Sequence, residues 1–303
     1  MSSILITGGT GLIGKHLYRL LKERGHKVVL LSRNRTSDTE VQTYAWDLEK
    51  GEIDKEALES ADYIIHLAGE NIGERRWTPK QKQLIIDSRV KTTQLIFDKI
   101  KENNIIPKAF ISASATGYYG ISPTDKTFKE SDPPGNDFLG NTCFQWEQAV
   151  DRFKELGVRT VKIRTGVVLT TQGGALAKMA APVKMGIASA LGNGRQYIPW
   201  IHIEDICAIY IKAIEDNEMN GIYNAVAPDY KTNAEFTRTL AKVLKKTYFL
   251  PNVPSVMLRL IFGKMSEIIL KGNRVSAEKI MASGYRFQFP DLKGALTDLF
   301  RKS

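Results

Sequence analysis

The stretch from Ile4 to Leu17, which reads ILITGGTGLIGKHL, restricts the possible folds of this chain more than any other. Its first four residues are typical of a short buried strand, and apolar residues return at helical spacing from Leu12 onward. The glycines between them lie in a strand-to-helix turn, where Gly8 can take a positive φ, Gly11 lets a pyrophosphate approach the backbone and Gly14 lets the helix pack closely. The start of that helix also offers free N–H groups and a positive dipole end to phosphate. We predict a dinucleotide site here, with a plain tight turn as the alternative; the expected contacts are Gly8, Thr10, Gly11, Leu12, Ile13 and Gly14.

Strand and helix patterns alternate along the rest of the chain. Strands are expected at 27–31, 41–46, 61–69, 109–120, 159–169 and 221–227, and helices after residues 12 and 78, over 142–156, up to about Glu215, and over 232–244. Residues 173–194 look less regular, and apolar spacing after residue 249 predicts further helices, including 256–261. The pattern predicts an α/β fold: a Rossmann-type, doubly wound parallel sheet with a smaller, mainly helical C-terminal substrate domain.

The end of the second predicted strand indicates which dinucleotide fits. In this fold an acidic residue there binds the ribose 2′-hydroxyl of NAD, whereas an arginine accommodates the 2′-phosphate of NADP. Here Ser32 and Arg33 follow the strand, and the first acidic residue, Asp38, comes too late. Arg33 can bind a phosphate through two hydrogen bonds, so we predict NADP(H); the alternative is a solvated loop arginine.

These patterns suggest a division of the chain. We assign residues 1–170 to an NADP-binding Rossmann domain, to which residues 195–227 return. Residues 171–194 and 228–303 form a substrate-side domain, and 249–303 form its C-terminal helical extension.

The ends of two later strands carry further candidate residues. Leu67, Ala68 and Gly69 end the 61–69 strand, where small residues let a cofactor approach the backbone. His66, within that strand, fits a packed residue better than a catalytic one. Arg89, on the helix after residue 78, is either a cofactor contact or an exposed helical arginine.

Ser114 lies at the carboxyl end of the 109–120 strand, and Tyr118 and Tyr119 follow it in a polar, aromatic loop. Open α/β sheets bind their ligands at this edge. We therefore take these three residues as the candidate catalytic set.

Composition limits the other functions. The net charge is +10 over 303 residues, but the lysines are dispersed and lack interleaved aromatics, which favours phosphate-bearing small molecules over nucleic acid. No apolar run reaches the roughly 18 residues of a membrane span, and the strand pattern starts at Ile4, so we expect neither a membrane segment nor a leader peptide. Cys143 and Cys207 show neither metal-ligand nor disulfide spacing. We expect a cytoplasmic protein with a small-molecule substrate and no metal; the oligomeric state stays open.

Several motifs together resemble the extended short-chain dehydrogenase/reductase superfamily of NAD-dependent epimerases and dehydratases: TGGTGLIG at 7–14, LAG at 67–69, SATGYYG at 114–120, WIHIED at 200–205 and GIYNAVAP at 221–228. A second set looks like its atypical subfamily of epimerase family proteins, which carry an extra C-terminal helical domain: LAGENI at 67–72, RW at 76–77, DSR at 87–89, WE at 146–147, RTGVVL at 164–169 and PWIHI at 199–203. The likeness spans nearly the whole chain. It implies a Rossmann domain, a small substrate domain and NADP(H) bound by Ser32, Arg33, Leu67, Ala68, Arg89 and Val168.

The catalytic motif of that superfamily is missing. Its members use Ser, Tyr and Lys, the last two spaced Tyr-x-x-x-Lys on one helix, so that the lysine charge lowers the phenol pKa. Ser114 matches the serine, but aligning Glu147 with the usual acidic residue places Leu139 at the tyrosine position and Cys143 at the lysine position. One of the tyrosines at 118–119 can supply a phenol instead, or Cys143 a thiol; pocket lining and burial are the alternative explanations.

Two functions follow from these observations. The first is an NADP(H)-dependent oxidoreductase or epimerase-like enzyme acting on a small polar substrate of the carbonyl or sugar type. The second is a non-catalytic NADP(H)-binding sensor or scaffold that lacks the Tyr-x-x-x-Lys relay. We favour the enzyme, because the loop from Ser112 to Tyr119 at the strand end contains serines and aromatic residues.

Overall fold

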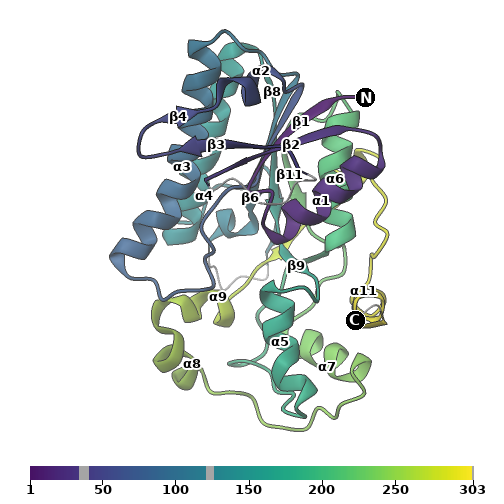
Figure 1. Ribbon diagram of the computed structural model, residues 1–303. Coiled ribbons are helices and arrows are strands. Elements are labelled where there is room, and N and C mark those ends of the chain that lie inside the picture. The colour runs from purple at the N-terminus through teal and green to yellow at the C-terminus, as the bar shows by residue number, and fades with distance from the viewer. Residues whose placement is uncertain (34–40, 121–125, 302–303) are drawn as a thin grey trace.

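A mostly parallel sheet of eight strands forms the centre of the structure (Figure 1), a computed structural model that describes residues 1–33, 41–120 and 126–301. In spatial order its strands are β11 (Gly221–Ala225), β8 (Arg159–Thr165), β6 (Ala109–Ala115), β5 (Tyr63–His66), β1 (Ser3–Thr7), β2 (Lys27–Ser32), β3 (Thr43–Asp47) and β4 (Glu52–Ile53). Among the described strand pairs of this sheet, only the edge pair β3–β4 is antiparallel. The chain runs outward from β1 on one side, then returns to build the other side, which confirms the doubly wound sheet.

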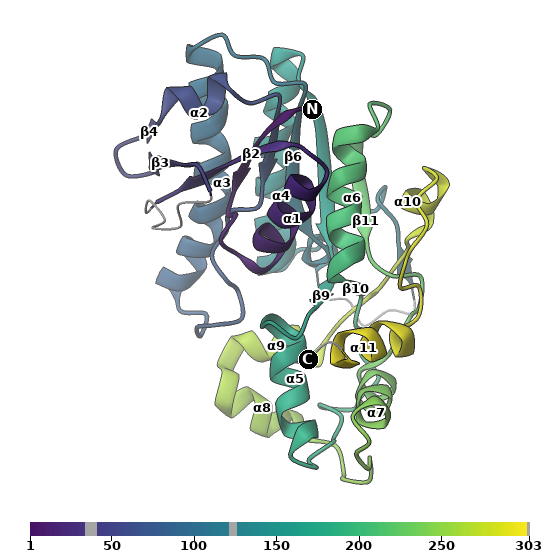
Figure 2. The ribbon, with the colours of Figure 1, turned by 45° about the vertical axis from the view of Figure 1, so that its right-hand side comes forward.

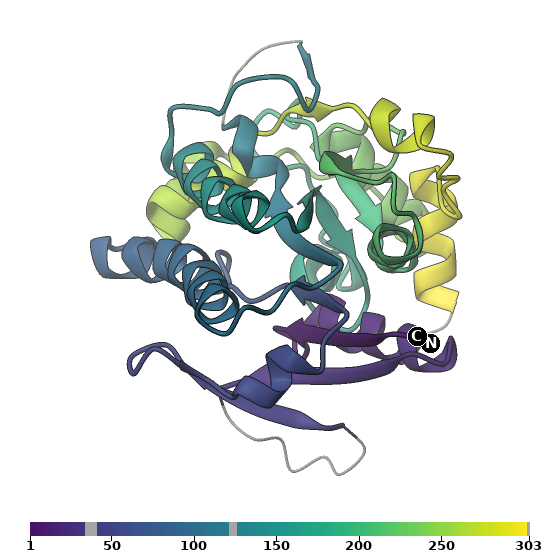
Figure 3. The same cartoon turned by 90° about the horizontal axis from the view of Figure 1, so that it is seen from above.

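Helices cover both faces of this sheet (Figure 3). One face carries α1 (Leu12–Glu23) and α6 (Ile203–Glu215), and the other carries α2 (Lys55–Glu59), α3 (Pro79–Glu102) and α4 (Phe138–Asp151). β1 shows why its sequence is continuously apolar: Ile4 and Ile6 pack toward α1, while Leu5 packs on the α3 side. A strand buried on both faces needs apolar residues at every position.

Two helix starts follow from their sequences. Thr78 caps α3, accepting a hydrogen bond from the Gln81 backbone N–H, with Pro79 in the first turn. Thr232 and Glu235 form a full capping box at the start of α7 (Asn233–Val243), within the helix predicted over 232–244.

The prediction of one continuous strand over 159–169 is wrong. It breaks at Gly166 into β8 and the short β9 (Val167–Leu169), which pairs with β10 (Trp200–His202) outside the main sheet. A Cβ on Gly166 would lie 2.5 Å from the Pro199 carbonyl oxygen, so only glycine fits where the two segments meet. Another small sheet pairs β7 (Thr127–Phe128) with β12 (Arg274–Val275), neither of which was predicted.

The supposedly less regular region 173–194 contains a helix, α5 (Gly174–Lys184), despite Pro182 in its last turns. Leu176, Ala180 and Val183 recur at helical spacing and are buried, which is the signal that the flanking glycines obscured. The predicted helix 142–156 begins earlier, at Phe138, and its end is a 3-10 segment, η2 (Arg152–Leu156).

The C-terminal part is mainly helical, as predicted, and most of it lies below the sheet in Figures 1 and 2. Besides α5 and α7 it comprises α8 (Ser255–Phe262), η3 (Gly263–Met265), α9 (Ser266–Leu270), α10 (Glu278–Ala282) and α11 (Leu292–Arg301).

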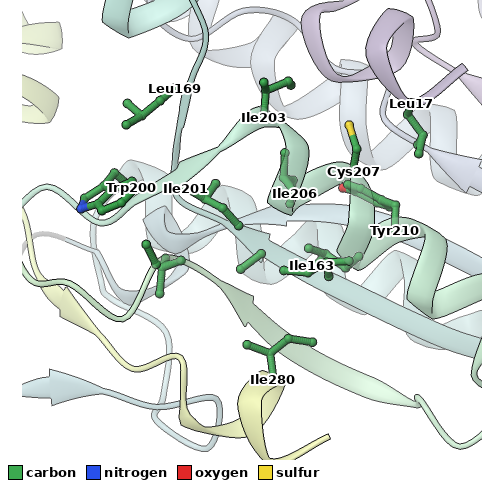
Figure 4. Packing of buried hydrophobic residues seen from close by; sticks show 14 of the residues in the cluster. Leu17, Ile163, Leu169, Trp200, Ile201, Ile203, Ile206, Cys207, Tyr210 and Ile280 are labelled. Carbon is green, nitrogen blue, oxygen red and sulfur yellow. The ribbon is translucent and has the colours of Figure 1, made fainter. Parts of the chain in front are cut away.

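One hydrophobic cluster joins this part to the sheet. It extends from Ile4 of β1 through α6 to Leu292 and Leu296 of α11. Figure 4 shows its middle, where Trp200 and Ile201 of β10 and Ile206 of α6 lie in the same layer of side chains.

Candidate functional site

The predicted dinucleotide turn is a strand-to-helix turn in which backbone packs on backbone. β1 ends at Thr7 and α1 begins at Leu12. Gly8 has the expected positive φ, 69°, and a Cβ added to it would lie 2.8 Å from the backbone nitrogen of Ala68. A Cβ on Gly14 would come within 2.5 Å of the Gly8 carbonyl oxygen, so Gly14 lets α1 pack on the turn itself. Neither glycine can gain a side chain unless the backbone moves.

The N-terminus of α1 is open. Gly11 is its N-cap, no side chain of a described residue caps it, and its first turn contains no acidic residue. Its unpaired N–H groups and dipole are therefore available to an anion. Thr10 and Gly11 are exposed, and Ile13 is half-buried. Leu12 lies against the start of α5, because a Cβ on Gly174 would be 3.0 Å from its Cδ1 atom.

The end of β2 lies beside this turn. The parallel register pairs Thr7 with Leu31, so Ser32 and Arg33 leave the sheet at the same edge as the glycines. Ser32 is half-buried and Arg33 is exposed. Asp38 lies outside the described residues. The position of Arg33 suits a phosphate contact, and the preference for NADP(H) over NAD stays a prediction.

His66 is a packed residue, as expected. Its Nδ1 atom lies 2.7 Å from Thr7 Oγ1, and its Nε2 atom lies 3.3 Å from Thr92 Oγ1. Since the Thr92 hydroxyl donates to a carbonyl of α3, it accepts from Nε2–H, and Nδ1 accepts from Thr7. The Thr7 oxygen in turn accepts from the backbone N–H of Ala68 at 3.2 Å. Burial lowers the pKa of His66 to about 3, so the ring is neutral and holds the backbone at Ala68 in place.

Arg89 reaches from α3 to the end of β5 and is not an exposed helical arginine. Its Nη2 atom donates to the Glu70 carbonyl at 3.0 Å and its Nη1 atom to the Ile85 carbonyl at 2.9 Å. A Cβ on Gly69 would lie 3.0 Å from the Arg89 Cζ atom, so the glycine leaves room for the guanidinium. Burial lowers the pKa of Arg89. A partly buried cation thus lies where residues 67–69 leave the sheet.

Val168 lies outside the main sheet. It is half-buried in β9, opposite Ile201 of β10. β9 lies between the main sheet and α5 (Figures 1 and 2), and α5 begins against Leu12 of the glycine turn. The helix that follows β9 therefore begins next to the predicted cofactor turn.

A buried ion pair lies beside Ser114. Arg164 of β8 is fully buried, and its Nε and Nη2 atoms donate to the two Glu147 carboxylate oxygens at 2.8 Å and 2.9 Å. Burial alone lowers the pKa of Arg164, but the hydrogen bonds and charge of Glu147 outweigh burial, and the pKa is raised. The Ser114 hydroxyl donates to Glu147 Oε1 at 2.7 Å. A strong, charge-assisted network therefore fixes the Ser114 side chain.

The two candidate tyrosines have different surroundings. The Tyr119 phenol accepts from Arg164 at 3.1 Å and donates to the Asn224 Oδ1 atom at 2.6 Å, and burial raises its pKa to about 12. The ring of Tyr118 lies under the Arg164 guanidinium, 3.3 Å from the Cζ atom to the ring centre. Burial also raises the pKa of Tyr118. Because a guanidinium only donates, its contact with Tyr118 leaves the phenol proton available.

The residues at the missing Tyr and Lys positions lie close to the same loop. A Cβ on Gly117 would lie 3.4 Å from the Leu139 Cβ atom and 3.8 Å from the Cys143 Sγ atom. Burial raises the pKa of the Cys143 thiol to about 12, so this thiol stays protonated at neutral pH. Both cysteines, Cys143 and Cys207, are free and buried.

Sequence reasoning missed the pairing of Glu147 with Arg164 and the role of Asn224. A signal was present, because Lys162 and Arg164 alternate with the apolar Val161 and Ile163 and so point to one buried side of the sheet. Buried cations need carboxylate partners, and Glu147 and Asp151 stand one helical turn apart on α4. Asp151 accepts from Lys162 at 2.7 Å.

The parallel sheet, the open glycine turn and the polar strand ends beside it are the features of a Rossmann-type nucleotide-binding fold. The chain belongs to the NAD-dependent epimerase/dehydratase family, whose model matches residues 4–225. A second model, a domain of unknown function called DUF1731, matches residues 253–299 in the helical C-terminal part.

Relatives align over almost the full chain. It is 38% identical over 300 residues to the epimerase family protein SDR39U1 of Mus musculus, with 98% of this chain and 99% of that protein covered. It is 38% identical over 299 residues to the epimerase family protein YfhF of Bacillus subtilis (strain 168), covering 98% and 97%. A crystal structure of human SDR39U1 (isoform2) with NADPH superposes with a TM-score of 0.89 at 36% identity, covering 99% of this chain and 100% of that one.

Two other kinds of site find no support in the described residues. None of their helices combines the length and apolar composition needed to cross a membrane. No three of their His, Cys, Asp or Glu side chains gather as a metal ion would require.

Proposed function

We propose that this protein is an NADP(H)-dependent oxidoreductase or epimerase-like enzyme that acts on a small polar substrate of the carbonyl or sugar type. The open N-terminus of α1, behind the tightly packed Gly8–Gly14 turn, carries the proposal. The human relative crystallised with NADPH supports the choice of cofactor.

The groups that would hold NADP(H) lie at three neighbouring strand ends. The N–H groups at the start of α1 suit the pyrophosphate. Arg33, after β2, suits the 2′-phosphate. Arg89 can offer the guanidinium donors that its bonds to Glu70, Ile85 and Ser88 do not use.

The bound nicotinamide would supply or accept a hydride, and the chain would supply the proton. Tyr118 is the better of the two phenols for this role, because Tyr119 already donates its proton to Asn224. The burial that raises the Tyr118 pKa keeps the phenol protonated at neutral pH, so Tyr118 suits a general acid that donates to a carbonyl oxygen.

Cofactor binding gives a direct test. Titration of the protein with NADPH and NADH, followed by nicotinamide fluorescence, should show tighter binding of NADPH. Arg33→Ala should remove most of the difference, roughly ten- to a hundredfold, because a charge-assisted phosphate contact is worth about 1.5–3 kcal/mol. Arg24→Ala is the control, since Arg24 pairs with Glu215 on the surface. Equal affinities of the parent protein for NADPH and NADH would contradict the cofactor assignment.

Turnover tests the enzymatic part. Tritium transfer from labelled NADPH into a panel of carbonyl compounds should be detectable, and Tyr118→Phe should reduce it by about a hundredfold or more, the usual effect of removing a general acid. NADPH affinity should barely change, since Tyr118 is not expected to contact the phosphates. Retention of full activity by Tyr118→Phe would make the Tyr118 assignment wrong.

One observation favours the second candidate, a non-catalytic NADP(H)-binding sensor or scaffold. Leu139 and a protonated, buried Cys143 stand where the superfamily places its Tyr and Lys. If NADPH binds but no compound oxidises it, while other ligands or proteins change its affinity, the sensor function is favoured.

A further inference from the structure

The direction of the Ser114 hydrogen bond restricts what the substrate can offer at this position. A serine hydroxyl has one proton to donate and two lone pairs that accept. The Ser114 Oγ atom lies 2.7 Å from Glu147 Oε1, and both residues are buried, Ser114 with 4% of its surface exposed. A carboxylate bound at both oxygens by a guanidinium is ionised and can only accept. The single Ser114 proton is therefore directed at Glu147.

The charges behind Glu147 keep this direction fixed. Arg164 contacts both carboxylate oxygens, and the Lys162 Nζ atom lies 4.0 Å from Oε2. Loss of the Glu147 charge would leave a fully buried guanidinium without its counter-charge, which is strongly unfavourable. A ligand carbonyl would have to compete with an ionised carboxylate for the Ser114 proton.

Ser114 lies at the ligand edge of the sheet. The register pairs His66, the last residue of β5, with Ser112, so Ser114 is two residues beyond the end of the neighbouring strand. The same edge holds the glycine turn and Arg89. An open α/β sheet binds its ligand outside these strand ends.

We propose that Ser114 meets the substrate only through its lone pairs, so that the group bound beside it is a hydroxyl donor and the site selects the alcohol form of its substrate there. This rests on the proposed function, since it places the substrate next to Ser114. Tyr119 supports the same selection, because its proton is also directed inward, toward Asn224. Among the hydroxyls of this described network, the Tyr118 phenol remains to donate to a substrate oxygen.

Ligand-observed NMR on Ser114→Ala tests the proposal. The probes are two matched pairs, 2-butanol with 2-butanone and glycerol with dihydroxyacetone. Alcohols are titrated with NADPH bound and ketones with NADP+ bound, so that no turnover occurs, and each compound is compared with itself across variants. Ser114→Ala should weaken the alcohols by about two- to tenfold, the value of one neutral hydrogen bond, and leave the ketones within about twofold.

Two further variants sharpen the test. Ser112→Ala is the matched control, because the Ser112 hydroxyl donates to the Ala113 carbonyl, and neither class of compound should respond. Glu147→Gln, if it folds, should leave both classes of compound within about twofold, since the amide oxygen can still accept from Ser114 and from the Arg164 Nε atom.

Some outcomes would overturn the proposal. Weakening of the ketones as much as the alcohols would show that Ser114 donates to the ligand. The inference would also be refuted if Ser114→Ala changed the affinity of neither class, or if no alcohol bound. If NADPH still bound with parental affinity, the cofactor assignment would be unaffected. Failure of NADPH to bind would refute the proposed function as well.

Discussion

Protonation of His66 should destabilise this protein at mildly acidic pH. The ring is fully buried, and its Nδ1 atom accepts from Thr7, whose oxygen holds the Ala68 N–H. A proton on Nδ1 would turn this acceptor into a second donor facing the Thr7 hydroxyl, inside an apolar layer that includes Phe110 and Trp146. The folded state therefore resists a proton that the unfolded chain accepts.

The size of the effect follows from the pKa difference. Burial lowers the pKa of His66 from 6.5 to about 3 in the folded protein. The unfolded state binds the proton first as pH falls, so stability is lost between about pH 6.5 and pH 3, at up to roughly 1.4 kcal/mol per pH unit. At about pH 5 the loss due to His66 is on the order of 2 kcal/mol.

Urea unfolding at about pH 7 and pH 5 measures this loss. His66→Asn provides the comparison, because an amide can keep a hydrogen bond to Thr7 and does not titrate. The parent should lose about 2 kcal/mol more than the variant between the two pH values, and subtraction cancels the other titrating groups. Equal losses in the two proteins would refute a buried, neutral His66.

Three more predictions concern other parts of the structure. Gly14→Ala places a Cβ about 2.5 Å from the Gly8 carbonyl oxygen and should weaken NADPH binding at least about tenfold in a fluorescence titration, whereas Gly73→Ala, which meets only an ordinary contact at 3.7 Å, should not. Asp205→Ala removes a carboxylate that accepts three hydrogen bonds from residues 285–289, and should cost roughly 2–4 kcal/mol in urea unfolding and speed proteolysis of the C-terminal segment; unchanged protease resistance would contradict this. Cys143, with a thiol pKa raised to about 12 by burial, should resist iodoacetamide at about pH 8 until the protein is unfolded, and rapid labelling of the folded protein would contradict its burial.

The sequence predicted most of the strands and helices, because each of them depends on residues that are close together along the chain. The Ile4–Leu17 stretch contains a strand, its turn and a helix start. The residues around Thr232 mark the start of α7, because the capping box lies within four residues. The break at Gly166 could not be found this way, because the cause is the Pro199 carbonyl, which is distant in sequence and close in space. The helix α5 was missed because glycines flank it and hide its apolar spacing.

The same distinction between local and long-range contacts applies to the candidate site. The glycine turn and the β2 end could be placed from sequence, since a register of parallel strands brings their carboxyl ends together. Which hydroxyl can donate to a ligand could not, because it depends on Arg164, Glu147 and Asn224, which come from three elements and meet only in the fold. Tyr118 and Tyr119, adjacent in sequence, are distinguished only by these partners.

The hydrophobic cluster that begins at Ile4 and ends with Leu296 and Leu299 has a consequence for biosynthesis. Synthesis proceeds from the N-terminal to the C-terminal side. The strand β1 is therefore made well before α11, although both belong to the same hydrophobic core. Until α11 is made, part of the apolar surface around β1 stays exposed to solvent, and such a state is prone to association with other chains. A chain that lacks α11 would therefore leave the strands around β1 with an unfinished core.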